Sequence, residues 1–537
     1  MRSFDGFLLI NNIKLPIDAS AKEAFSVAKG KIKRAGLLSF ANDYSIYRRS
    51  IDARQKPDIY FVYSVAVRGD FPRFDEEMLN SHGISICENK TPEVIKGDTP
   101  LENPPVVVGS GPCGLFSALL LAEQGYKPVI IERGGNVAQR QAATELFNTQ
   151  HTLDTDTNIQ FGAGGAGTFS DGKLVTRIND PLTNYVLGRF VDFGAPSEIN
   201  YIAKPHIGTD VLSVVVDRII DRIIELGGKI YYHTKFISAL HRGGNVYAVQ
   251  TDKGAIPCGA LILAIGHSAR DTYESLISSD FDIVPKSFSV GMRIEHLAED
   301  IDRSLYGSSA GHHLLGHAEY ALSHDTKNRG VYTFCMCPGG VVVAAASEEG
   351  GVVVNGMSYN SRSERNSNSA VVSTVFKEDY GNTPMSAIEF QRGIERAAFK
   401  SGGGGYAAPI ITVGDFLNGE CRTQPKRILP SYMSGNNVKL CKPEEYLPGF
   451  VCNSIRGALV GFDKKIKGFA ASDAILTGAE TRTSAPIRIL RNNDTRLATG
   501  FKNLYPAGEG AGYAGGITSA AIDGVKSALA LMRVYKP

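Results

Sequence analysis

The chain contains no apolar run that approaches the length of a membrane-spanning helix. Its first residues, MRSFDGFLLINNIKL, lack the long apolar core and the small-residue cleavage site of a secretory signal. The 8 cysteines are scattered and do not stand at disulfide spacings, as expected in a reducing compartment. The sequence therefore predicts a soluble, cytoplasmic protein with no membrane partner.

An excess of charge of one sign is also missing, since 57 Lys and Arg residues stand against 55 Asp and Glu, for a formal net charge of +2. A dedicated nucleic-acid binder would be more basic, so a nucleic-acid partner is not favoured. The length of 537 residues is too great for a single core and predicts two or three domains.

Glycine, by contrast, is abundant at 58 residues, and its most informative cluster lies in residues 106–134. This stretch reads VVVGSGPCGLFSALLLAEQGYKPVIIERG: a β-branched run, a G-x-G-x-x-G turn, an apolar helix and a second strand that ends at Glu132. Strand, turn and helix in this order form the dinucleotide-binding fingerprint in the context that it requires.

The residues of this fingerprint have separate roles. Gly109 allows the tight turn, Gly111 lets the backbone approach a pyrophosphate, and Gly114 lets the helix pack closely on the sheet. The Glu132 carboxylate can accept hydrogen bonds from a ribose diol and would repel a 2′-phosphate. The site therefore suits FAD or NAD and disfavours NADP.

A second glycine-rich segment, NLYPAGEGAGYAGGITSAAIDG at 503–524, decides between these two cofactors. It resembles the second FAD motif of glutathione-reductase-type flavoproteins, in which an acidic residue, here Glu509, binds the ribityl chain. A helix that begins near Ile517 would direct its free N–H groups at the pyrimidine edge of the flavin, where reduced flavin carries negative charge. The predicted cofactor is FAD.

A third glycine-rich segment, FGAGGAGTFSDGK at 161–173, lies between the other two. Its glycines cannot pack a core and are suited to close approach to a flat ligand or to the pyrophosphate. Asp171 and Lys173 form either an exposed pair or part of the lining of the flavin pocket, with Lys173 near flavin N5 or a substrate oxyanion.

Five motifs together resemble the uncharacterised bacterial FAD-dependent dehydrogenase family, whose members are often labelled NAD(FAD)-utilizing dehydrogenases. They are GGAGTFSDGKL, SVGMRIEH, YTFCMCPGG, ETRTSAPIRI and LYPAGEGAGYAGGI. The resemblance covers nearly the whole chain and implies bound FAD and the fold described next, but it supplies no settled substrate.

The predicted fold is α/β. A Rossmann-like FAD domain of the glutathione-reductase type is discontinuous (96–275 and 496–537), with an inserted α+β substrate or cap domain at 276–495. Residues 1–95 form a small βαββ module resembling a ferredoxin-like domain. This module is either a packing or dimerisation unit or an RNA-binding unit, whose basic candidates are Lys31, Lys33, Arg34, Arg48 and Arg49.

The residues predicted to bind the cofactor come from the three glycine-rich segments and from the strand ends beside them. They are Gly109, Gly111, Pro112, Cys113, Gly114, Glu132, Arg133, Arg140, Gly165, Ala166, Gly167, Thr168, Ser170, Asp171, Lys173, Ile237, Ala264, Gly266, Gly508, Glu509, Gly516, Ile517 and Thr518. No metal site is predicted.

Three residues are candidates for catalysis: Lys173, Arg482 and His267. Arg482 would either bind a substrate carboxylate or hold two domains together, and His267 would be either structural or an acid–base group. Cys335 and Cys337 form a C-x-C that is either an inert pair or a dithiol that shuttles electrons to the flavin.

A second complete dinucleotide fingerprint is absent from the sequence. NAD(P)H, if used, must therefore bind without a Rossmann domain of its own. The predicted function is an FAD-dependent oxidoreductase that transfers hydride at flavin N5 to or from an unknown small substrate. Two alternatives stay open: a monooxygenase or RNA-modifying flavoenzyme that uses the N-terminal module, and a non-catalytic flavin-binding regulatory protein.

Overall fold

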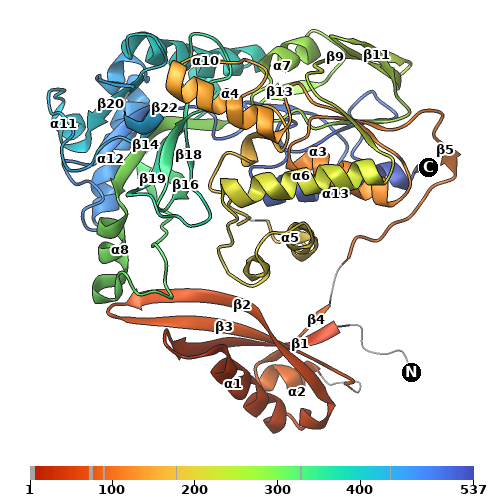
Figure 1. The fold of residues 1–537 in the computed structure, drawn as a ribbon, viewed down its shortest axis with the longest axis vertical. Coiled ribbons are helices and arrows are strands. Elements are labelled where there is room, and N and C mark those ends of the chain that lie inside the picture. Colours follow the sequence, from red (N-terminus) through yellow and green to blue (C-terminus); the bar gives the residue numbers. More distant parts are fainter. Residues whose placement is uncertain (1–5, 72–75, 89–90, 177, 327–328, 436) are drawn as a thin grey trace.

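The structure is a computed structural model that describes residues 6–71, 76–88, 91–176, 178–326, 329–435 and 437–537. A small N-terminal unit lies beside a larger body and is joined to it by a long connecting segment (Figure 1). In the described part of the chain, no helix combines the length and the apolar character that crossing a bilayer requires.

The N-terminal unit is a four-stranded antiparallel sheet in the order β2-β3-β1-β4. Its elements are β1 (Gly6–Pro16), α1 (Ala21–Arg34), β2 (Ala41–Gln55), β3 (Asp58–Gly69), α2 (Glu76–Ser81) and β4 (Ile84–Glu88). This βαββαβ order is the ferredoxin-like arrangement. The sequence predicts its first four elements but misses α2 and β4, which are too short to show a clear period.

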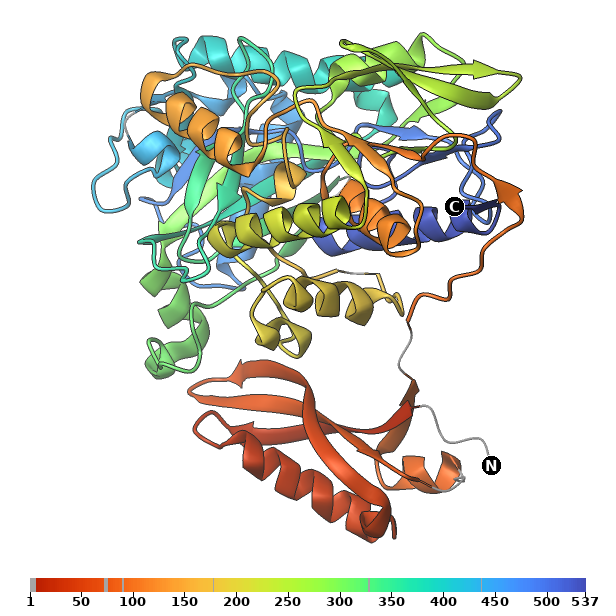
Figure 2. The ribbon, with the colours of Figure 1, turned by 45° about the vertical axis from the view of Figure 1, so that its right-hand side comes forward.

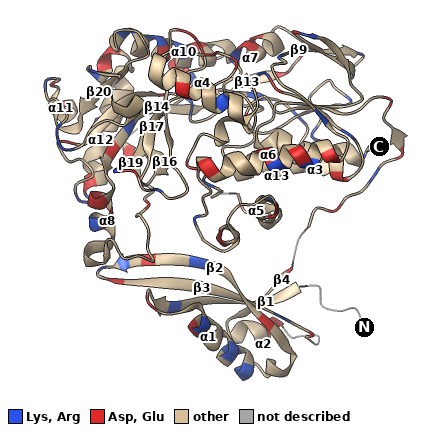
Figure 3. Ribbon diagram, viewed as in Figure 1, with Lys and Arg blue, Asp and Glu red and all other residues tan. Residues whose placement is uncertain are grey.

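This unit contacts the body through β2. The Arg49 backbone N–H donates to the Tyr201 carbonyl at 2.7 Å, and the Ala203 N–H donates to the Arg49 carbonyl at 2.9 Å. The Arg49 guanidinium also lies over the Tyr201 ring. Lys and Arg residues recur along α1, on the side of the unit away from the body (Figures 2 and 3). The contacts of Arg49 with Tyr201 and Ala203 favour the packing interpretation of the module. They also occupy Arg49, one of the five basic RNA-binding candidates.

The centre of the body is a five-stranded parallel sheet in the order β24-β12-β6-β7-β8. Its strands are β6 (Val106–Val108), β7 (Val129–Ile131), β8 (Lys229–Tyr231), β12 (Leu261–Leu263) and β24 (Leu504–Pro506). All pairs are parallel. The sheet therefore takes one edge strand from the far end of the sequence, where the second glycine-rich segment begins.

Both faces of this sheet are covered by other elements. Alternate strand residues point to opposite sides, so each strand contributes to both contacts. Val107 and Ile262 pack with the helices α3 (Pro112–Glu123), α6 (Thr209–Glu225) and α13 (Ile517–Met532), which lie side by side in Figure 1. Val106 and Val108 pack instead with a three-stranded antiparallel sheet. That sheet consists of β9 (Phe236–Arg242), β10 (Asn245–Thr251) and β11 (Gly254–Pro257).

The apolar and β-branched residues between 229 and 240 suggest one strand, but the structure divides this stretch into two. The chain forms β8, breaks at residues 232–235 and then enters β9 in a different sheet. His233 lies in the break with φ of 50°. This left-handed conformation interrupts an extended strand and redirects the chain.

Residues between 283 and 489 build a second sheet, with seven strands in the order β15-β16-β19-β14-β22-β20-β21. Its strands are β14 (Phe288–Leu297), β15 (Ser323–Thr326), β16 (Arg329–Cys337), β19 (Asn366–Val375), β20 (Ala408–Thr412), β21 (Val438–Leu440) and β22 (Ile475–Glu480). The segments that enter and leave this region pair with each other as β13 (Ile283–Pro285) and β23 (Ile487–Ile489). Helix α12 (Gly449–Asp463) packs into the core of this sheet.

The remaining elements connect and flank these sheets. The helices are α4 (Val137–Gln150), α5 (Thr183–Asp192), α7 (Arg270–Ile277), α8 (Ala298–Tyr306), α9 (Lys377–Tyr380), α10 (Pro384–Ser401) and α11 (Val413–Asn418). The hairpin β17 (Val341–Ala344) and β18 (Val354–Met357) is antiparallel, and β5 (Thr99–Pro100) pairs with β25 (Tyr535–Lys536). The domain boundaries at 95, 275 and 495 remain predictions.

Candidate functional site

A cavity of about 440 Å³ lies where the parallel sheet meets the seven-stranded sheet. Residues that end or follow four parallel strands line it, namely Gly109, Glu132, Ala264 and Ala507. The opposite wall includes Thr333–Met336 from β16. In open α/β sheets, the crevice at the carboxyl ends of the strands is the usual ligand site.

Two helices begin at this cavity. Gly111 is the N-cap of α3, and Gly516 is the N-cap of α13. Free N–H groups and the positive end of a helix dipole attract anionic groups, such as a pyrophosphate at one helix and a reduced flavin at the other. A Cβ added at Gly515 or Gly516 would meet no atom within 4 Å, so space is open in front of α13. These features fit FAD.

The fingerprint turn depends on close backbone approach. Gly109 has φ of 93°, and a Cβ there would lie 2.4 Å from the Ala264 carbonyl oxygen. A Cβ at Gly114 would lie 1.9 Å from the Gly109 carbonyl oxygen. Only glycine permits this contact between the turn and the first turn of α3.

Glu132 is buried and accepts hydrogen bonds at both carboxylate oxygens. Its Oε2 accepts from the Ser110 backbone N–H at 2.9 Å and the Ser110 hydroxyl at 2.7 Å. Its Oε1 accepts from the N–H groups of Gly134 at 3.0 Å and Gly162 at 2.9 Å. Glu132 therefore ties the fingerprint turn to the third glycine-rich segment at the cavity wall.

We expect Glu132→Arg to lower FAD affinity by about tenfold or more, because it removes four accepted hydrogen bonds and places an unpaired cation at the wall. Flavin content after purification and after dialysis against excess FAD measures the effect. Glu225→Arg, the same change on the exposed end of α6, should retain flavin as the parent does. Unchanged retention in Glu132→Arg would contradict the assignment of this turn to the nucleotide.

Most of the predicted cofactor residues line this one cavity. These are Gly109, Gly111, Pro112, Cys113, Glu132, Arg133, Gly165, Ala166, Gly167, Ser170, Lys173, Ala264, Gly266, Glu509, Gly516 and Ile517. All three catalytic candidates line the cavity as well: Lys173, which is also a cofactor candidate, His267 and Arg482. Segments more than 300 residues apart in the sequence therefore meet in one place.

Seven predicted cofactor residues do not line the cavity: Gly114, Arg140, Thr168, Asp171, Ile237, Gly508 and Thr518. Arg140 and Asp171 are buried behind the wall, and Gly114 packs against the turn. The Thr518 hydroxyl donates to the Leu174 carbonyl at 2.8 Å. Ile237 is 42% exposed, and its neighbour Phe236 lines the cavity in its place, because successive strand residues face opposite sides.

Lys173 belongs to a charged cluster at the cavity. Its Nζ lies 2.7 Å from Asp171 Oδ2 and 3.8 Å from Glu319 Oε1. Arg362 bridges the same two carboxylates, at 2.7 Å each. Burial opposes the charge of Lys173, but the carboxylates of Asp171 and Glu319 raise its pKa above the usual value. Lys173 therefore stays an ammonium at neutral pH and is unsuited to act as a base.

His267 lines the cavity with its Nδ1 2.7 Å from the Ser268 hydroxyl oxygen. Burial, together with the nearby cations of Arg482 and Arg270, lowers the pKa of His267 to about 3. The imidazole is therefore neutral at neutral pH, which disfavours a role as proton donor.

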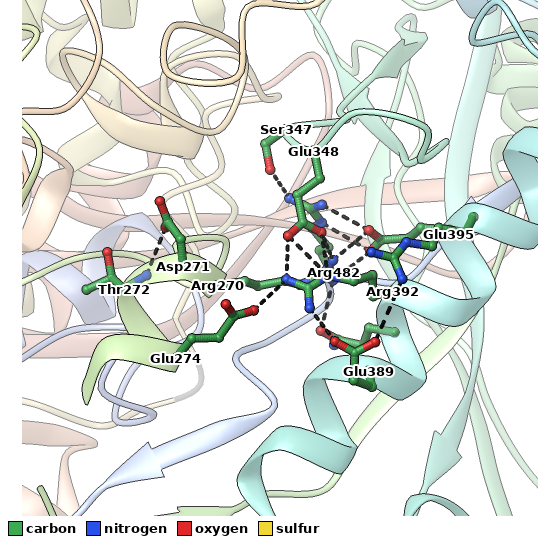
Figure 4. A network of polar contacts seen from close by, with 12 residues as sticks. Arg270, Asp271, Thr272, Glu274, Ser347, Glu348, Glu389, Arg392, Glu395 and Arg482 are labelled. Carbon is green, nitrogen blue, oxygen red and sulfur yellow. Dashed lines mark hydrogen bonds and ion pairs between the residues drawn. The ribbon is translucent and has the colours of Figure 1, made fainter. Parts of the chain in front are cut away.

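Arg482 is held in a buried ion-pair network (Figure 4). Its Nη2 lies 3.0 Å from Glu395 Oε2, and its Nη1 donates to the Ser347 hydroxyl. Arg270 pairs with the same carboxylate, at 2.7 Å. The network joins α7, α10 and the segment after β22, so this geometry favours the domain-holding interpretation of Arg482.

Sequence reasoning missed several residues of the site. Glu319, Lys204 and Asn355, which line the cavity, and Arg362, which pairs with Glu319, stand in no recognisable motif. Thr483 also lines the cavity and lies within the motif ETRTSAPIRI, but the sequence gives it no separate role. The positive φ of Arg362, 50°, is a feature of the folded backbone and leaves no mark in the sequence.

The fold and the site define a flavoprotein, and comparison with known proteins agrees. A family model described as "FAD-dependent protein, C-terminal domain-like" matches residues 287–483, and one described as "FAD binding domain" matches residues 102–155. A domain of unknown function matches residues 8–68. FAD, the cofactor predicted from the sequence, is confirmed by the first two matches.

The family itself follows from a close relative. An uncharacterized protein of Clostridium beijerinckii is 46% identical over 526 residues, which is 97% of each chain. The chain therefore belongs to the same family as this clostridial protein, a family of FAD-dependent proteins. The finer resemblance, to NAD(FAD)-utilizing dehydrogenases, stays a prediction.

Solved structures are more distant. L-amino acid deaminase from Proteus vulgaris is 14% identical with a TM-score of 0.32, over 83% of this chain and 97% of that chain. Glycine oxidase from Bacillus cereus is 10% identical with a TM-score of 0.32, over 81% of this chain and 98% of that chain. At these TM-scores the likeness carries no argument about this chain.

Proposed function

We propose that the protein is an FAD-dependent oxidoreductase in which hydride passes between N5 of the flavin and a small substrate held against the seven-stranded sheet. One observation carries the proposal: a single cavity is lined on one side by the dinucleotide fingerprint and on the other by β16 and Arg482. Bound FAD supplies a two-electron acceptor and donor, and the chain supplies binding, orientation and electrostatics.

The N-terminus of α13 is placed to stabilise negative charge on a reduced cofactor, because Gly516 and Ile517 line the cavity. Glu509 lines the same region, and burial raises its pKa to about 7. This carboxyl can therefore hold or release a proton near neutral pH at the cofactor end of the cavity.

The other end suits an anionic substrate. Lys173, Lys204 and Arg362 bring three cations to the cluster, against the two carboxylates of Asp171 and Glu319. Lys204 has the weakest engagement, 3.9 Å from Glu319 Oε2, and is the group most available to a substrate carboxylate.

The domain arrangement of this proposal has a nucleotide domain in two pieces, 96–275 and 496–537, and a substrate domain at 276–495. The pairing of β13 with β23 supports it, because the strands that enter and leave the inserted region lie together. Within the described ranges, the central sheet is the only parallel sheet of more than two strands. We therefore expect any nicotinamide donor to bind at the open cavity.

Anaerobic titration of the FAD-loaded protein with NADH and with NADPH tests the electron donor. We expect one of them to abolish the visible absorption of oxidised flavin, and readmitted air or an added acceptor to restore it. Failure of both donors would reject a nicotinamide-dependent reaction. Flavin that no donor reduces and no acceptor reoxidises would instead support the non-catalytic alternative.

A further inference from the structure

The C-x-C of Cys335 and Cys337 lies at a β-bulge that faces the cavity. Phe334 pairs with Ala370 and Cys337 with Asn368, so β16 holds one extra residue against β19. Cys335 has φ of 46°, a left-handed conformation that is costly for a residue with a Cβ. Bulges beside active sites redirect side chains, and here Cys335 lines the cavity while Cys337 is fully buried.

A buried arginine lies beside both cysteines. Arg293 is fully buried and donates to the Cys335 carbonyl and to the Cys337 sulfur, the latter at 3.6 Å. Its carboxylate partner is Glu480, 3.0 Å away. The positive charge of Arg293 lowers the pKa of both thiols, because a nearby cation favours the thiolate form.

The pKa values of the two thiols shift in opposite directions because of their mutual hydrogen bond and their burial. The hydrogen bond with Cys337 lowers the pKa of Cys335; burial opposes this, and the cations of Arg293 and Lys173 lower the pKa further. Burial raises the pKa of Cys337, and its bond to Cys335 adds to the rise. One thiol is thus prepared to ionise at neutral pH while its neighbour keeps its proton.

Cys335 lines the same cavity as the residues predicted to hold the flavin. Cys335, Glu509 and Gly516 line it together. Burial raises the pKa of Glu509, the cation of Lys286 opposes the rise, and negative charge on Cys335 adds to it. No such arrangement is needed for two cysteines that only fill space.

We propose that Cys335 and Cys337 form a second two-electron centre that exchanges electrons with the bound FAD by cycling between dithiol and disulfide. The proposal rests on the FAD site of the proposed function. In the oxidising direction an S–S bond forms between the two sulfurs, and the Cys337 thiol gives up its proton. The two electrons and one proton pass to oxidised flavin, so that thiolate, thiol and FAD become disulfide and anionic reduced FAD. The reverse step reduces the disulfide.

Reductive titration of the air-oxidised, FAD-loaded protein tests this centre. Under anaerobic conditions, dithionite should deliver about four electron equivalents per FAD to the wild type, two for the flavin and two for the disulfide. Cys335→Ser and Cys337→Ser should each take up about two. The matched control, Cys421→Ser, changes a half-buried cysteine outside the cavity and should behave as the wild type.

Uptake of about two equivalents by flavin-loaded wild type would overturn the dithiol proposal and leave the proposed function intact. A chain that binds no FAD would instead contradict the proposed function. In that case the thiols are still tested by peptide mapping of the air-oxidised, alkylated chain. A Cys335–Cys337 disulfide there supports the pair, and two alkylated thiols overturn it.

Discussion

Replacement of Glu395 by Ala should lower the free energy of unfolding by about 3–5 kcal/mol, the usual cost of removing one partner from a buried ion pair. Glu395 Oε1 and Oε2 each lie 2.7 Å from an Arg270 nitrogen, and Arg482 lies 3.0 Å from Oε2. The side chains of Arg270, Glu395 and Arg482 are 1%, 2% and 4% exposed. The variant therefore leaves two buried cations without their shared carboxylate (Figure 4).

Urea denaturation of flavin-saturated protein measures this loss, since saturation holds the contribution of the ligand constant. Glu389→Ala is the matched control on the same helix, because the Glu389 side chain is 49% exposed and should cost no more than about 0.5 kcal/mol. A loss below about 1 kcal/mol in Glu395→Ala would contradict a structural role for the network.

The ion pairs of Glu395 also determine how the stability difference between wild type and Glu395→Ala depends on pH. Burial opposes ionisation of Glu395, but the cations of Arg270 and Arg482 hold its pKa well below the usual value. A carboxylate with a depressed pKa stabilises the fold fully above its unfolded pKa of about 4.3, and this contribution is lost as the pH falls toward the folded pKa. The stability difference between wild type and Glu395→Ala should therefore narrow on acidification below about pH 4.

A comparison of the dinucleotide fingerprint with the ion-pair network around Glu395 shows which parts of the structure could be predicted from the sequence. The strand at 106–108, the turn at Gly109 and the helix α3 follow one another within a few residues, so local patterning specifies them. Arg270 and Glu395 are separated by 125 residues and meet only after the two sheets come together. The sequence around Arg270 or Glu395 does not predict this ion pair.

The candidate site divides in the same way. Its nucleotide side was predictable because Gly109, Gly111 and Glu132 belong to one short motif whose geometry is tied to its spacing. Three further lining residues reach the cavity from unrelated loops and strands, namely Lys204, Glu319 and Asn355. Ile237 lies one position away from the residue that lines the cavity, Phe236, because the alternation of a strand decides which neighbour faces it.

Arg140 was predicted to bind the cofactor, yet it is fully buried and supports the site from behind. Its guanidinium donates to the carbonyls of Asn158 at 3.0 Å, Ile159 at 2.8 Å and Gly165 at 3.0 Å, and also to that of Ala163. A Cβ at Gly162 would lie 2.2 Å from Arg140 Cδ, so the third glycine-rich segment is wrapped closely around this side chain.

Arg140→Met should therefore lower the free energy of unfolding by about 3 kcal/mol or more, because each carbonyl left without a donor costs about 1–3 kcal/mol. FAD affinity should fall by about tenfold or more, since Gly165 and its neighbours line the cavity and lose their support. Urea denaturation of the flavin-free protein and FAD titration measure the two effects separately.

The control for loss of an arginine is Arg222→Met, on the solvent side of α6, where the side chain is 45% exposed. It should change stability by no more than about 0.5 kcal/mol and leave FAD affinity unchanged. An Arg140→Met protein that keeps its stability but loses FAD would contradict the supporting role and return Arg140 to direct cofactor contact. If Arg140 supports the glycine-rich wall from behind, Arg140→Met should lose both stability and FAD affinity.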